Sequence, residues 1–195
     1  MEGAKPCCTP LGSKKLDHSG PLLSNPTEYR SIVGGLQYLT WTRPDLAFVV
    51  NQICQFMHAL REQHLQAAKR VLRFLNGYIS HGLWFTKGPV DLSAYSDADW
   101  AGCTFDRRST NGYYVFLGPN LISWSAKKQS IVARSSTRAE YREDQLADLH
   151  TKSLSKNRFS YLCSKLPIGI NSDSSSCLRG CIKEDDKSSI FVTVK

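Results

Sequence analysis

The sequence predicts an α+β fold, in which a helical segment is followed by an antiparallel sheet and a C-terminal helix. Up to Gly77, apolar residues recur every three or four positions, which is the period of an amphipathic helix. After Gly77, apolar and polar residues alternate in short runs separated by Gly, Pro and Asn, as in strands joined by turns. The chain has 195 residues and is 41% hydrophobic, which is enough for the core of one or two domains.

The first predicted helix begins at a complete helix-start signature. Asn25 can act as the N-cap, Pro26 stands at the first helical position and Glu28 at the third, so we expect a helix that runs to about Thr40. Before it, residues 1–24 are rich in Pro, Gly and Ser and predict an extended arm rather than a packed element.

Two further helices complete a helical segment that we predict over residues 25–88. Thr42 and Asp45 stand three positions apart, as in a second capping box, and apolar residues follow at helical spacing. The third helix, within 61–79, has an apolar side made of Leu65, Ala68, Val71, Leu72 and Leu75. Its other side carries Lys69, Arg70 and Arg73. The pattern predicts three antiparallel helices with a basic outer face.

A sheet domain is predicted over residues 89–166. Strand-like runs occupy residues 81–87, 92–97, 112–118 and 121–127, and a further run over 130–136 is a candidate strand of the same antiparallel meander. Residues 136–154 are helical in pattern, with Ala139, Leu146 and Leu149 as candidate buried positions. Residues 167–195 are Ser-rich and mixed in charge, which predicts a mostly disordered tail in which "IFVTV" is too isolated to count as a strand.

Composition indicates the environment and the class of partner. The net charge of +8 favours an acidic partner such as nucleic acid. Seven cysteines without a framework indicate a reduced, intracellular compartment, and Cys177 and Cys181 lack the His or second Cys pair of a zinc site. No apolar run is long enough to span a bilayer, so we expect no membrane partner.

The stretch "SDADWAG" sets two acids at the end of a strand-like run. Asp97, Asp99 and Gly102 match positions one, three and six of a calcium-binding loop, but position twelve is Arg108 where that loop needs a Glu. A second interpretation is a two-metal site for phosphodiester hydrolysis, which needs several carboxylates from different elements. Glu140 and Asp148 are the candidate further acids.

The residues alone leave that interpretation open. Thr137 and Glu140 have the spacing of a capping box, and this reading of Glu140 is favoured because it needs no metal. An acid such as Asp148 is more often a solvated helix residue, and one such as Asp99 a turn residue.

Several long motifs, in order, resemble one family. They are "YRSIVGGLQYLTWTRPDLAFVVNQICQFMHA", "HLQAAKRVLRFLNG", "SDADWAGCTFDRRSTNGYYVFLGPNLISWSAKKQ", "VARSSTRAEYR" and "DQLADLHTKSL". From Gly3 to Ile168 the chain closely resembles the C-terminal part of the Pol polyprotein of copia-type plant retrotransposons. The resemblance implies that residues up to about Lys87 correspond to the thumb and connection of a reverse transcriptase, and that the meander belongs to a ribonuclease H fold.

The resemblance also implies roles for single residues. Asp97 matches the first metal-binding Asp of the family, Glu140 its catalytic Glu and Asp148 the last acid of the set. The implied cofactor is Mg²⁺, and the implied partner is an RNA/DNA hybrid or another nucleic acid.

The chain departs from the family pattern after Arg142. The segment that carries a further essential Asp is absent, because Arg142 runs directly into Glu143, and Arg138 replaces the usual acid beside Ala139. Without that carboxylate, two Mg²⁺ ions lack a shared ligand, so we expect negligible turnover. The sheet should also lose strands on one side, which exposes a backbone edge and favours aggregation.

Three functions follow from these observations. The first is a catalytically inactive Pol fragment, left by an internal deletion or by a gene model that omits a segment. The second is an active Mg²⁺-dependent ribonuclease H. The third is a nucleic-acid-binding remnant whose phosphate contacts come from Lys69, Arg70, Arg73, Arg107, Arg108, Lys127 and Lys128. Trp100 and Trp124 are candidates for base stacking, although core positions are the more usual role of such aromatics.

Overall fold

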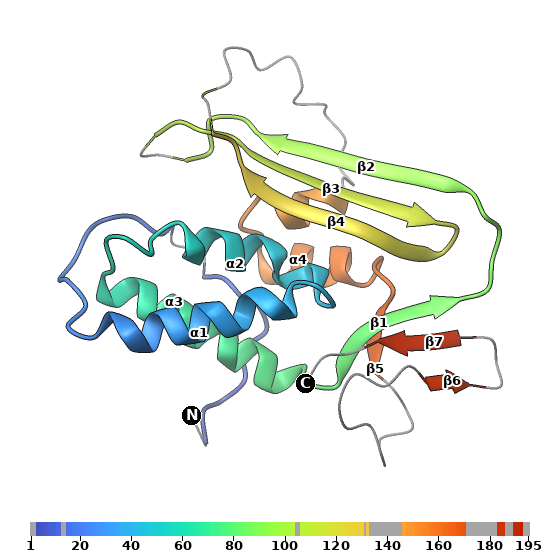
Figure 1. Cartoon of the computed structure of the whole chain (residues 1–195), viewed down its shortest axis with the longest axis horizontal. Helices are drawn as coiled ribbons and strands as arrows, with labels where there is room; N and C mark the ends of the chain where they lie inside the picture. The colour runs from blue at the N-terminus through green and yellow to red at the C-terminus, as the bar shows by residue number, and fades with distance from the viewer. Residues whose placement is uncertain are drawn as a thin grey trace.

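The computed structural model describes residues 3–12, 15–103, 106–130, 132, 146–170, 183–185 and 189–192. Helices pack against one side of a three-stranded antiparallel sheet, and a second antiparallel sheet lies beside them (Figure 1). The predicted α+β class is therefore confirmed.

Helix α1 (Pro26–Leu39) begins where the sequence predicts. The side chain of Asn25 accepts a hydrogen bond of 3.0 Å from the backbone N–H of Thr27, which satisfies one of the otherwise unpaired donors of the first turn. Helix α3 (Glu62–Gly77) also forms as expected, but the face that it buries is shifted. Its buried residues are His64, Ala67, Ala68, Val71 and Phe74, while the predicted Leu65, Leu72 and Leu75 are only partly buried.

The second helix is shorter than predicted and begins differently. Residues Pro44–Leu46 form a 3₁₀ turn, η1, which continues into α2 (Ala47–Cys54). The predicted capping box of Thr42 and Asp45 does not form, because the Asp45 carboxylate binds the guanidinium of Arg43 instead. Both side chains of this pair are buried. A buried guanidinium without a counter-charge costs more free energy than a helix end without a cap, so the carboxylate pairs with Arg43.

The N-terminal arm carries no helix over its described residues, yet it packs, which corrects the expectation of an unpacked segment. The backbone N–H of Cys7 donates to the carbonyl of Arg73 on α3, and the Arg70 guanidinium donates to the Thr9 hydroxyl at 2.9 Å. Four apolar side chains explain the packing, because they lie against the helical core: Cys7, Leu11, Leu16 and Leu23.

Strands β2 (Leu92–Asp99), β3 (Thr110–Leu117) and β4 (Asn120–Lys128) form the predicted meander in the order β2-β3-β4. The prediction that the run over 81–87 belongs to this meander is wrong. That run forms β1 (His81–Thr86), which pairs with β5 (Ile168–Ile170) and β7 (Ser189–Val192), and β6 (Lys183–Asp185) extends the same sheet.

The prediction that "IFVTV" is too isolated to count as a strand is therefore wrong, because β7 includes Ile190, Phe191 and Val192. The tail supplies backbone partners to both edges of β1, whose N–H and C=O groups need them.

The core of the sheet lies on its helix-facing side. Tyr114, Phe116 and Leu121 pack there against the 3₁₀ turn η2 (Leu146–His150) and helix α4 (Lys156–Cys163). Leu146 and Leu149 are buried, as predicted, whereas Ala139 and nearly all of the strand predicted over 130–136 lie outside the described residues.

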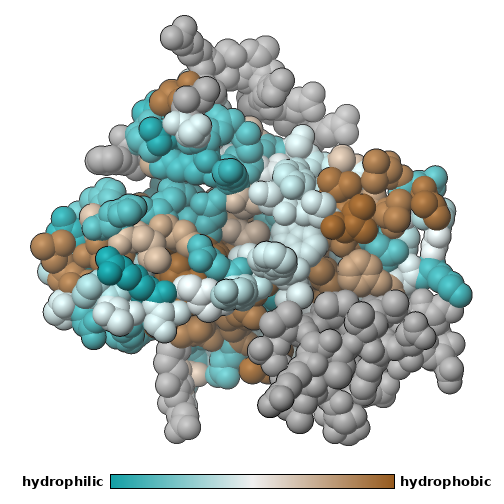
Figure 2. Space-filling model, in the orientation of Figure 1, coloured by the Kyte–Doolittle hydropathy of each residue, from teal (hydrophilic) through white to brown (hydrophobic). Residues whose placement is uncertain are grey.

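Strand β2 is an edge of the sheet, as the departure from the family pattern predicts. Across the described ranges it pairs only with β3, and its first residue, Leu92, is 71% exposed. Val90, just before it, is 80% exposed. Figure 2 shows apolar side chains gathered at this end of the sheet.

Contacts join the helices to the meander directly. The indole N–H of Trp124 donates to the carbonyl of Thr40 at 2.8 Å, and the side-chain amide of Asn51 on α2 donates to the carbonyl of Ala126 on β4. Within the described parts of the chain, we find no helix with the length and apolar character needed to cross a membrane.

Candidate active site

Two of the three predicted acids meet where η2 lies against the sheet. Asp97 stands near the end of β2, opposite Gly112 of β3, and its side chain is 7% exposed. Asp148 comes from η2, and its side chain is 11% exposed. Glu140 lies outside the described residues.

Gly112 allows η2 to pack closely against β3. A Cβ atom at this position would lie 2.4 Å from the Cβ of His150 and 3.3 Å from the carbonyl oxygen of Ala147, both in η2. The distance of 2.4 Å is far below van der Waals contact and that of 3.3 Å is tight, so only glycine allows η2 to lie this close to β3. The close packing brings the turn that follows η2 to Asp97.

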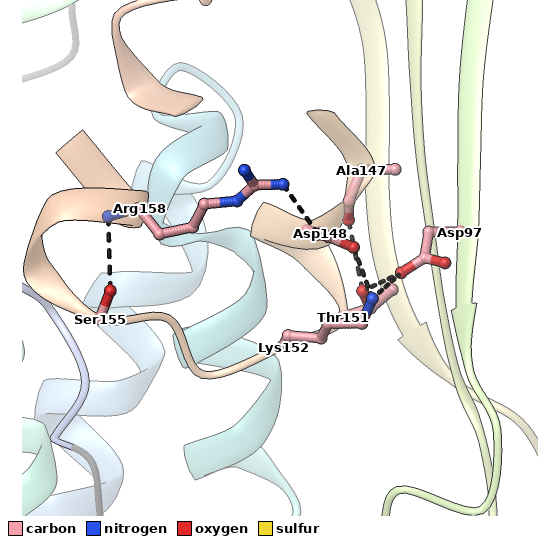
Figure 3. A network of polar contacts seen from close by, with 7 residues as sticks. All are labelled: Asp97, Ala147, Asp148, Thr151, Lys152, Ser155 and Arg158. Carbon is pink, nitrogen blue, oxygen red and sulfur yellow. Dashed lines mark hydrogen bonds and ion pairs between the residues drawn. The ribbon is translucent and has the colours of Figure 1, made fainter. Parts of the chain in front are cut away.

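Lys152 connects the two acids, and the hydroxyl of Thr151 binds one of them, as Figure 3 shows. The hydroxyl of Thr151 donates to Oδ2 of Asp97 at 2.5 Å. The ammonium of Lys152 lies 2.6 Å from Oδ1 of Asp148 and 3.5 Å from Oδ2 of Asp97. The guanidinium of Arg158 lies 3.6 Å from Oδ2 of Asp148. Three of the four carboxylate oxygens therefore face a donor or a cation.

The charges of the site also affect neighbouring groups. Burial alone would lower the pKa of Lys152, but the hydrogen bond to Asp148 and the charge of Asp97 outweigh it and raise that pKa. Burial raises the pKa of Asp99, with a smaller contribution from the charge of Asp97, while Lys15 and Lys152 oppose the rise. Lys152 is thus held in its charged form next to the acids.

Asp99 does not join the pair, and the glycine of "DADWAG" explains its position. A Cβ atom on Gly102 would lie 1.6 Å from Oδ2 of Asp99, so the carboxylate occupies the space that any side chain at 102 would need. Asp99 lines a cavity of about 620 Å³ between the N-terminal arm, α2 and the loop after β2. Thr151 and Lys152 line the same cavity.

The described residues do not fit a two-metal site. Nowhere among them do three or more His, Cys, Asp or Glu side chains converge as a metal would require. Two Mg²⁺ ions need several carboxylate oxygens. Here the described acids instead face Lys152, Arg158 and Thr151.

The seven predicted phosphate-binding cations lie in two separate places. On α3, Lys69 pairs with Glu28 of α1 at 3.2 Å and Arg70 donates to Thr9 of the N-terminal arm, so both cations already have partners. At the loop end of the meander, Lys128 and Arg108 both pair with Asp106. Arg107 and Lys127 are exposed at that same end, and Arg73 is half-buried on α3.

The two tryptophans differ in exposure. Trp124 is half-buried, and its indole N–H bonds Thr40. Trp100 is 46% exposed in the turn after β2.

Sequence reasoning missed Thr151, Lys152 and Arg158. One signal was present, because Asp148 and Lys152 stand four residues apart, the spacing at which opposite charges meet on one helical face. Thr151 carries no such local signal, since its partner Asp97 is 54 positions earlier in the chain.

Comparison with known proteins agrees with the motifs. The chain is 58% identical over 145 residues to the "Retrovirus-related Pol polyprotein from transposon RE1" of Arabidopsis thaliana, an alignment that covers 73% of the chain and 10% of that protein. It matches the corresponding polyprotein from transposon RE2 with the same identity and coverage. An uncharacterized mitochondrial protein of Arabidopsis thaliana is 48% identical over 162 residues, which is 81% of the chain and 68% of that protein.

No protein-family model matches the chain, and no solved structure does. The chain spans about a tenth of the length of the two transposon polyproteins. The identity over most of the chain nevertheless shows its origin: it belongs to the Pol polyproteins of copia-type plant retrotransposons, of which it represents a fragment.

Proposed function

We propose that the chain is a catalytically inactive fragment of a retrotransposon Pol polyprotein, derived from the end of the reverse transcriptase and a shortened ribonuclease H region. The observation that carries this proposal is the state of Asp97 and Asp148. The two acids are close together, yet Lys152 pairs with both of them, Thr151 donates to Asp97, and no third acid of the described residues joins them.

The physical argument concerns charge and ligand number. Two-metal hydrolysis needs an ion that activates water and a second that stabilises the leaving oxygen, with carboxylate oxygens shared between them. Mg²⁺ gives up its waters reluctantly and is held weakly by too few carboxylates. The pair of Asp97 and Asp148, already neutralised by Lys152 and Arg158, offers a poor site for such ions.

A cleavage assay tests the proposal. The purified chain is incubated with an end-labelled RNA/DNA hybrid and Mg²⁺ or Mn²⁺, beside an Asp97→Asn variant and an active ribonuclease H as positive control. We expect no cut RNA from chain that circular dichroism shows to be folded. Cleavage that the Asp97→Asn substitution abolishes would establish an active enzyme and overturn the proposal.

A transcript measurement tests the origin of the shortened region. Reverse transcription and sequencing across the codons of Arg142 and Glu143 should show the two codons joined in the mature message. Recovery of an additional in-frame segment between them would mean that the protein made in the cell carries more of the family pattern, and the ribonuclease H activity would again be expected.

Binding of nucleic acid without cleavage is a second candidate function. It is favoured by the cations at the loop end of the meander, where Arg107 and Lys127 are exposed within a chain of net charge +8. Fluorescence anisotropy with a labelled hybrid should show affinity that falls steeply between about 50 and 200 mM salt. An Arg107→Gln/Lys127→Gln variant should bind more weakly and with a shallower salt dependence, whereas equal binding would exclude this surface.

A further inference from the structure

We infer that Lys152 is a built-in counter-ion of the Asp97 and Asp148 pair, so that a divalent cation can bind these acids only after the lysine ammonium has moved away. The inference rests on the proposed function, because it treats the two aspartates as acids of a former metal site. The inference adds that Lys152 is the residue that prevents a divalent cation from binding these two acids.

The position of the ammonium carries the inference. Its Nζ lies between the two carboxylates, 2.6 Å from Asp148 and 3.5 Å from Asp97, where an ion shared by both would have to lie (Figure 3). The second oxygen of Asp148 faces Arg158 at 3.6 Å. Two negative charges are thus balanced by two positive ones, and an added divalent ion would find no net attraction in the pair.

Exposure shows how the site could be opened. The Lys152 side chain is 46% exposed, whereas those of Asp97 and Asp148 are 7% and 11% exposed. The lysine therefore covers the acids from the solvent side. Lys152 lines the cavity of about 620 Å³ beside Asp99, whereas Asp97 and Asp148 are not among its lining residues, so an ion that enters this cavity meets the lysine before the two acids.

Binding of Mn²⁺, followed by electron paramagnetic resonance of the free ion, tests this inference on the full chain. Lys152→Met removes the charge and keeps the apolar stem, and Lys152→Gln also keeps a hydrogen-bond donor near Asp148, which helps the variant to fold. Lys156→Met is the matched control, because Lys156 is an exposed lysine at the start of α4. A combined Lys152→Met/Asp97→Asn variant identifies the acid involved.

We expect the wild type and Lys156→Met to bind Mn²⁺ equally weakly, and both Lys152 variants to bind at least tenfold more tightly. The combined variant should lose that gain. Affinities of the Lys152 variants within twofold of wild type would overturn the inference, as would a gain that survives the loss of Asp97. Cleavage of a hybrid by the wild type would instead overturn the proposed function, so the two failures are distinguishable.

Discussion

His150 and Pro44 are joined by a hydrogen bond of 2.9 Å between Nε2 and the carbonyl oxygen, although they are 106 positions apart in the chain. The imidazole is fully buried and stacks on the ring of Tyr114 with a centroid distance of 4.1 Å. Its Nε2 donates to the carbonyl, which leaves Nδ1 unprotonated in a neutral ring. The contact connects the helical part to η2 and so to the strand that carries Asp97.

The free energy of unfolding should decrease as the pH is lowered, because the buried imidazole of His150 is neutral in the folded protein. Burial lowers the pKa of His150 from its ordinary 6.5 to about 4. Between these values the unfolded chain binds the proton and the folded chain does not, so stability is lost as the pH falls from about 6.5 to about 4. The loss attributable to His150 should approach about 3 kcal/mol.

Urea unfolding at a series of pH values checks this, with His150→Gln as the comparison. The variant should be less stable at pH 7 but show a flatter decline toward pH 4. Because His64 also has a lowered pKa from burial, only the difference between the two proteins reports His150. Parallel declines would show that His150 is not the group that titrates.

The buried ion pair of Arg43 and Asp45 should be essential to the helical part. The guanidinium contacts both oxygens of Asp45, at 2.9 and 2.8 Å, and also donates to the carbonyl of Tyr78 at 3.0 Å. Asp45→Asn leaves a buried arginine without its counter-charge and should cost about 3–5 kcal/mol of unfolding free energy in urea titration.

The matched control for that substitution is Glu28→Gln, which breaks the exposed pair with Lys69 and should cost less than about 1 kcal/mol. Similar losses in the two variants would mean that burial does not set the strength of the Arg43 pair.

Two glycines should respond to alanine with opposite signs. At Gly112 the added Cβ would meet His150 and Thr151, so Gly112→Ala should destabilise by about 1–3 kcal/mol and disturb the approach of η2 to Asp97. Gly34 lies inside α1 with nothing within 4 Å of an added Cβ, so Gly34→Ala should stabilise by about 0.5–1 kcal/mol. Thermal melts of both variants measure the signs, and two shifts in the same direction would contradict the packing argument.

The sequence predicts the features that are local along the chain. Asn25 and Pro26 define the start of α1 because capping depends on neighbouring residues, and alternation predicts strands β2, β3 and β4. The partners of β1 could not be predicted, because they follow more than 80 positions later and strand pairing depends on tertiary packing rather than on the local pattern.

The candidate site divides in the same way. The motifs in the sequence predict Asp97 and Asp148 as site residues. The spacing of four residues between Asp148 and Lys152 also indicates a local ion pair, although the prediction did not include it. The bond from Thr151 to Asp97 depends on how η2 packs on the sheet, which the local sequence does not determine.

One edge of β2 is paired by no described residue, and this edge should make the protein prone to association. Leu92 is 71% exposed at the start of this strand, and edge strands with apolar surface pair readily with other chains. Leu92→Lys places a charge on the edge, a device that natural sheets use against such pairing. It should lower the rate of aggregation severalfold, measured by light scattering, with little change in the melting temperature because the leucine buries little surface. Ile79→Lys is the control, because Ile79 is 75% exposed but precedes all of the strands. If Ile79→Lys lowered the aggregation rate equally, the association would result from exposed apolar surface in general rather than from the edge of β2.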